Sequence, residues 1–61
     1  MEQIKSVMPV LRHNEWRVRV RTSEREVILG AGARYTMHQA QVYAESLRHV
    51  ISHHGIDAAI A

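Results

Sequence analysis

The sequence predicts an α+β fold, in which a three-stranded antiparallel sheet is followed by one helix that packs on one of its faces. Two regions with different apolar periods predict this order. Apolar residues alternate with arginines over 16–21, as in a half-buried strand, and recur every three or four residues over 37–54, as in an amphipathic helix. The length of 61 residues allows one small domain with a thin core. We therefore expect a single βββα domain over residues 1–61.

The first strand is expected at about residues 4–11. Its apolar residues do not alternate regularly, and Pro9 has no backbone N–H to donate to a neighbouring strand. Proline is tolerated at the edge of a sheet, where one side of the strand needs no partner. We therefore expect an edge strand that ends in a turn at His13 and Asn14.

The second and third strands are expected at about residues 15–21 and 25–30, joined as a hairpin. A turn centred on Ser23 and Glu24 would pair side chains that match: Val20 with Val27, Val18 with Leu29, and Arg21 with Glu26. This register places the valines of both strands and Leu29 on one face, and a slip by one residue would destroy the agreement.

The helix is expected at about residues 37–54, because the sequence holds both a start and a stop signal. Thr36, followed three residues later by Gln39, matches a capping box, and Gly55 suits the left-handed position that closes a helix. One apolar stripe lies between these signals: Ala40, Tyr43, Ala44, Leu47, Val50 and Ile51. Before the helix, the glycines of the segment 30–32 predict a bulge or turn.

Composition excludes several classes of protein. The chain has no cysteine, so it has neither disulfides nor a thiolate metal site, and this fits a reducing cytoplasm. No apolar run reaches the roughly 18–20 residues of a membrane span, and no signal peptide precedes the first strand. Eight basic against six acidic side chains give a net charge of only +2. We expect a cytoplasmic protein that has no contact with a membrane.

The positions of the arginines favour a nucleic-acid partner. If the apolar residues of 16–20 face the helix, then Arg17, Arg19 and Arg21 face away from it. Alternate strand residues lie roughly 6.5–7 Å apart, a spacing comparable to that of phosphates along one nucleic-acid strand. Two alternatives stay open. The face would be merely solvated, as Glu26 opposite Arg21 would suit, or would contact a protein partner; Ile28 on the same face favours a contact surface over plain solvent.

The run EWRVRVRTSEREVILGAGARYTMHQAQVYAESL resembles the sheet-plus-helix DNA-binding domain of plant ethylene-response factors. It is similar also to the arm-binding domains of phage and transposon tyrosine recombinases. The shared features are a tryptophan opening a basic and apolar strand, a second strand ending in Leu-Gly, and an alanine-rich helix beginning at a threonine. The resemblance covers roughly residues 12–51 and implies that the sheet enters the major groove. The contacts it implies come from Arg12, Arg17, Arg19 and Arg21, with Arg25 on the DNA backbone.

We therefore expect a small non-enzymatic module that binds duplex DNA, as an accessory protein of phage or mobile DNA. Arg17, Arg19 and Arg21 would make the main contacts. The expected peripheral phosphate contacts are Arg12, Arg25 and Arg34. The alternative is a protein-interaction module or homodimer with no nucleic-acid role, built on the sheet edges and on apolar residues of the helix flank and tail, Val42 and residues 56–60.

Catalytic and metal sites are not expected. No nucleophile, base and orienting group stand at a recognisable spacing. Glu45, His49 and His53 lie on one helical stripe, but no strand residue supplies the further ligand that a protein metal site needs. We therefore expect no enzyme activity, no metal and no cofactor.

Overall fold

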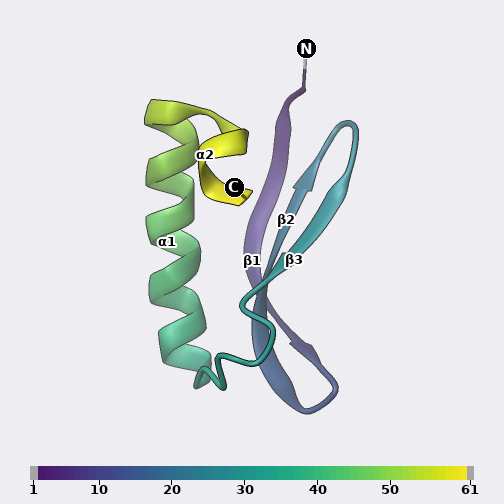
Figure 1. The fold of residues 1–61 in the computed structure, drawn as a ribbon, viewed down its shortest axis with the longest axis vertical. Coiled ribbons are helices and arrows are strands. Elements are labelled where there is room, and N and C mark those ends of the chain that lie inside the picture. The colour runs from purple at the N-terminus through teal and green to yellow at the C-terminus, as the bar shows by residue number, and fades with distance from the viewer. Residues whose placement is uncertain (1, 61) are drawn as a thin grey trace.

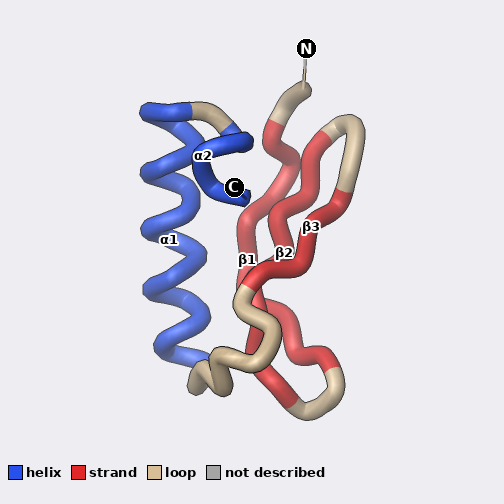
Figure 2. The backbone as a smooth tube through the Cα atoms, in the orientation of Figure 1, coloured by secondary structure: helices blue, strands red, loops and turns tan. Residues whose placement is uncertain are grey.

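The computed structural model describes residues 2–60 and confirms the predicted α+β order (Figure 1). Three strands come first: β1 (Ile4–Arg12), β2 (Glu15–Thr22) and β3 (Glu26–Leu29). They form one antiparallel sheet in the order β1-β2-β3. The long helix α1 (Met37–His54) follows, and a short helix α2 (Ile56–Ile60) ends the described chain. Both helices lie on the same side of the sheet (Figure 2).

The strand register agrees with the prediction. Between β2 and β3, Val20 pairs with Val27, Val18 with Leu29, and Arg21 with Glu26. β1 is an edge strand that pairs with β2, and its register shifts by one residue at a bulge between Ile4 and Ser6. From Ser6 onward the register has no further shift, so successive side chains of each strand point alternately toward α1 and away from it.

Both hairpin turns lie where the sequence places them. His13 and Asn14 have positive φ angles of 51° and 62°, as two-residue hairpins with a right-handed strand twist require. The turn between β2 and β3 is organised by Thr22. Its hydroxyl accepts hydrogen bonds from the backbone N–H groups of Glu24 and Arg25, at 3.1 and 3.0 Å.

Helix α1 begins and ends at the predicted caps. The Thr36 side chain accepts a hydrogen bond from the Gln39 backbone, and the Gln39 side chain accepts one from the Thr36 backbone. Gly55 ends the helix with a φ of 87°. α1 packs on β1 and β2, and the contact buries the core: Val7, Val18, Val20, Ala40, Ala44 and Leu47. Trp16 and Tyr43 pack at its margin.

The segment 56–60 differs from the prediction. The sequence suggests an apolar tail available to a partner, but the tail forms α2 and packs Ile56 and Ala59 against the core. The positive φ of Gly55 lets the chain reverse at the end of α1, and a core this thin gains from a further covering element. Val42 on α1 is exposed, at 51%. Within residues 2–60, neither helix has the length and apolar character needed to cross a membrane.

Candidate functional site

The face of the sheet turned away from α1 carries four of the six arginines predicted to bind. We call it the open face. The register assigns ten residues to it: Ser6, Met8, Val10 and Arg12 of β1, Glu15, Arg17, Arg19 and Arg21 of β2, and Glu26 and Ile28 of β3. Arg17, Arg19 and Arg21 form its central column, because β2 is the middle strand. The predicted row of arginines is therefore present on one surface.

The open face holds all of the formal net charge of the chain. Four of the eight basic and two of the six acidic side chains lie on it. The remaining four basic and four acidic side chains lie elsewhere and cancel one another. The net charge of +2 is small, but it is concentrated on one side of the molecule.

Arg19 and Arg21 are the two arginines of this face without a carboxylate partner within residues 2–60. Arg19 lies between Met8 and Ile28 in the register, and its Nη2 donates to the Met8 sulfur at 3.3 Å. Its Nε is buried and has no hydrogen-bond partner. The apolar neighbours therefore hold the stem of Arg19 against the sheet. Arg21 is exposed, although Glu26 is its neighbour in the register.

Arg17 and Arg12 are partly neutralised. Arg17 Nη2 lies 2.9 Å from Glu15 Oε2, and the Arg17 side chain is only 19% exposed. Arg12 Nη2 lies 3.8 Å from Glu26 Oε1. The Arg12–Glu26 pair is exposed and therefore weak, so it leaves Arg12 available to a competing anion, whereas Arg17 is largely covered beside Glu15.

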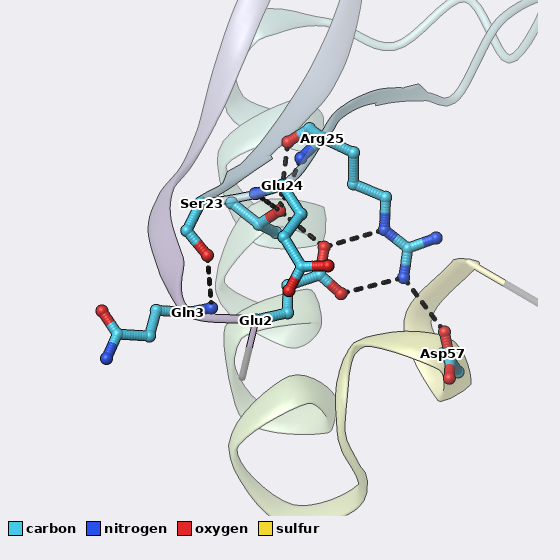
Figure 3. Close-up of polar contacts among 7 residues, drawn as sticks. Glu2, Gln3, Ser23, Glu24, Arg25 and Asp57 are labelled. Carbon is cyan, nitrogen blue, oxygen red and sulfur yellow. Dashed lines mark hydrogen bonds and ion pairs between the residues drawn. The ribbon is translucent and has the colours of Figure 1, made fainter.

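The two remaining predicted arginines lie elsewhere. Arg25 points toward α2 and is held by carboxylates: its Nε and Nη2 donate to the two Glu2 oxygens at 2.9 and 3.1 Å, and Nη2 also donates to Asp57 at 3.1 Å (Figure 3). Arg34 is exposed in the loop before α1, with a φ of 56°. The structure therefore does not bring Arg25 or Arg34 together with the open face.

Arg25 instead belongs to a polar cluster that the sequence analysis did not identify. We call it the terminal cluster, and it joins the start of the chain, the β2–β3 turn and α2: Glu2, Gln3, Thr22, Ser23, Arg25 and Asp57 (Figure 3). The buried Thr22 hydroxyl donates to Glu2 at 2.6 Å. Hydrogen bonds from Arg25, and then from Thr22, lower the pKa of the Glu2 carboxyl below its ordinary value of 4.5. The same contact with Glu2, followed by that with Asp57, raises the pKa of Arg25.

The terminal cluster predicts a pH-dependent contribution to stability. A lowered pKa means that ionised Glu2 stabilises the folded state above about pH 4.5, and that this contribution is lost as the pH falls through the lowered value. We expect Glu2→Gln to lower the melting temperature near neutral pH, and the difference from the unchanged protein to shrink in acid. Thermal unfolding followed by circular dichroism from about pH 7 to about pH 2 measures both curves. A difference that stays constant over this range would contradict the role of the Glu2 charge.

Two hollows lie between α1 and β1, on either side of Arg48. Arg48 Nη2 donates to the Val7 carbonyl and separates them. The first, of about 190 Å³, is lined by Ile4, Val7, Arg48, Ile51 and Ser52. The second, of about 290 Å³, is lined by Pro9, Gln41, Ala44, Glu45 and Arg48. The lining of the first hollow has one hydroxyl, that of Ser52, and no base. The lining of the second hollow has one carboxylate, that of Glu45, and no nucleophile. Neither lining therefore brings a nucleophile and a base together.

Aromatic residues contact one another where the loop before α1 meets the rest of the fold. Tyr35 pairs with Trp16 in a β-bridge, and its ring centroid lies 5.5 Å from that of Tyr43. Burial raises the pKa of the Tyr43 hydroxyl. On α1, the rings of His49 and His53 touch, but no group of three or more metal-ligating side chains is assembled within residues 2–60.

Comparison with known proteins yields no match: no family model, no curated protein and no solved structure is significantly similar to the chain.

Proposed function

We propose that this chain is a small non-enzymatic module that binds duplex DNA with the open face of its sheet. The observation that supports it best is the concentration of the whole net charge on that face. Phosphate neutralisation by arginine drives most non-specific binding to DNA, and the position of the positive charge decides which surface approaches. The absence of cysteine and the likeness to recombinase arm-binding domains support a cytoplasmic role with phage or mobile DNA.

The dimensions of the β2–β3 hairpin suit a major groove. Its two strands lie about 4.8 Å apart. The major groove of B-DNA is about 12 Å wide and admits a two-stranded β-ribbon. Alternate residues of β2 are roughly 6.5–7 Å apart, which is about two base-pair steps. Arg19 and Arg21 could then contact phosphate or guanine, while Met8 and Ile28 beside Arg19 could contact a thymine methyl group.

Two charge-matched variants test this proposal. Arg19→Gln and Gln41→Glu each lower the net charge by one, but Arg19 lies on the open face and Gln41 on the exposed side of α1. We expect Arg19→Gln to weaken binding to a mixed-sequence duplex roughly tenfold and to reduce the salt slope by about 1, because one contact is lost. We expect Gln41→Glu to have little effect. Fluorescence anisotropy over a salt series measures both quantities.

The salt series also gives the number of contacts. If each of the four arginines on the open face neutralises one phosphate, a plot of the logarithm of the binding constant against the logarithm of the salt concentration should have a slope of about −3.6. Circular dichroism of each variant checks that the fold is unchanged. Equal weakening by the two variants would mean that net charge, and not the open face, governs binding. No binding at low salt would refute the proposal.

Three apolar side chains on the open face support a second candidate, a protein partner. Met8, Val10 and Ile28 lie among the arginines, and Met8 is 41% exposed. An interface that combines apolar contact with arginine suits an acidic protein surface. A homodimer that paired two open faces would oppose eight arginines and only four glutamates, which disfavours it. Backbone NMR shifts on β2 and β3 that follow added DNA and weaken with salt would favour DNA over either alternative.

A further inference from the structure

His49 and His53 form an isolated pair on the last two turns of α1. Both are exposed, and their ring centroids lie 4.3 Å apart with the ring planes tilted by 44°. Within residues 2–60, neither ring makes a hydrogen bond or an ion pair with another side chain. The sequence led us to expect no metal, because a protein site needs a further ligand; from this geometry we propose instead that the two imidazoles, completed by water, chelate one transition-metal ion of the Zn²⁺ and Ni²⁺ class.

The chemistry of the pair suits such an ion. Imidazole nitrogens are good ligands for Zn²⁺, Ni²⁺ and Cu²⁺, whereas Mg²⁺ prefers oxygen. Two histidines four residues apart on one helix face are the arrangement by which helical zinc sites present two of their ligands. Here the two rings lie 4.3 Å apart between centroids, so both imidazoles are close enough for one ion to join them.

The surroundings favour a positive charge. The C-terminal end of a helix carries a partial negative charge of about half an electron, and α1 ends at His54. Glu45 lies one turn before His49 on the same stripe. The nearest arginine in sequence, Arg48, is bonded to the Val7 carbonyl of β1. Because no third protein ligand is assembled within residues 2–60, water would complete the coordination.

Calorimetric titration of the full chain with NiCl₂ and with ZnCl₂ tests the proposal. We expect one ion per chain with micromolar affinity, and we expect His49→Ala and His53→Ala each to weaken it about tenfold or more, because one of two ligands is lost. His54→Ala and His38→Ala are the matched controls. The His54 ring lies 6.5 Å from that of His53, and we expect both controls to leave the affinity nearly unchanged.

A second measurement separates chelation from weak surface binding. An ion that bridges two turns of α1 in the folded state should raise the melting temperature by several degrees at saturating metal. This rise should vanish in His49→Ala, and MgCl₂ should not produce it. Equal affinity in all four variants, millimolar affinity, or one ion shared by two chains would each overturn the intrachain site.

Discussion

Replacing Leu47 by alanine should leave the domain largely unfolded under conditions in which the unchanged protein is folded. Leu47 is 4% exposed and is the largest of the six side chains that form the buried core. Leucine-to-alanine substitutions in cores cost about 2–5 kcal/mol. A single core in a domain of this size rarely supplies more than about 3–5 kcal/mol of net stability. The loss is therefore comparable to the entire free energy of unfolding.

Urea denaturation followed by helical circular dichroism measures this effect, and Val42→Ala is its control. Val42 lies on the same helix, but it is 51% exposed, so its truncation should change the free energy of unfolding by no more than about 0.5 kcal/mol. A cooperative transition of Leu47→Ala with an unchanged midpoint would mean that the core is elsewhere than between α1, β1 and β2.

The sheet and the long helix could be predicted because their signals are local. The alternation of β2 and the short β2–β3 turn together admit one register that buries Val18 and Val20, and the structure has that register. For α1, Thr36 and Gly55 mark both ends of a regular apolar stripe. The same alternation assigns Arg17, Arg19 and Arg21 to the open face, because successive side chains of a strand point to opposite faces of the sheet.

The features that were missed depend on distant residues or on very short segments. Helix α2 spans five residues, too few for an apolar period to distinguish a helix from a tail. The sequence places Arg25 at the start of the third strand, but in the structure it lies in the turn before β3, and its partners Glu2 and Asp57 are 23 and 32 residues away. The β1–β2 register, with its bulge near Ile4, brings the start of the chain to this turn. Because nothing in the sequence marks that bulge, the sequence contains no signal for the terminal cluster.

Replacing Gly30 by alanine should destabilise the fold more than the same change at any other glycine. All three glycines have positive φ, which costs about 1–2 kcal/mol when a side chain is added. At Gly30 alone the added Cβ would also meet another group, at 2.8 Å from Tyr35 Cε2 and 3.3 Å from Cδ2. The Tyr35 backbone is bridged to Trp16 and its ring lies against the ring of Tyr43, so the ring has little freedom to withdraw, and such overpacking costs about 1–3 kcal/mol more.

Gly32→Ala provides a matched control, because Gly32 has a φ of 79° in the same loop and nothing lies within 4 Å of its added Cβ. The difference between the two variants in free energy of unfolding isolates the clash from the backbone cost. A third comparison identifies the ring: in a Tyr35→Ala background, Gly30→Ala should cost no more than Gly32→Ala, because the colliding atoms are gone. If the extra cost persists without the Tyr35 ring, then backbone geometry alone governs Gly30. If it disappears, the Tyr35 ring is the source of the extra cost at Gly30.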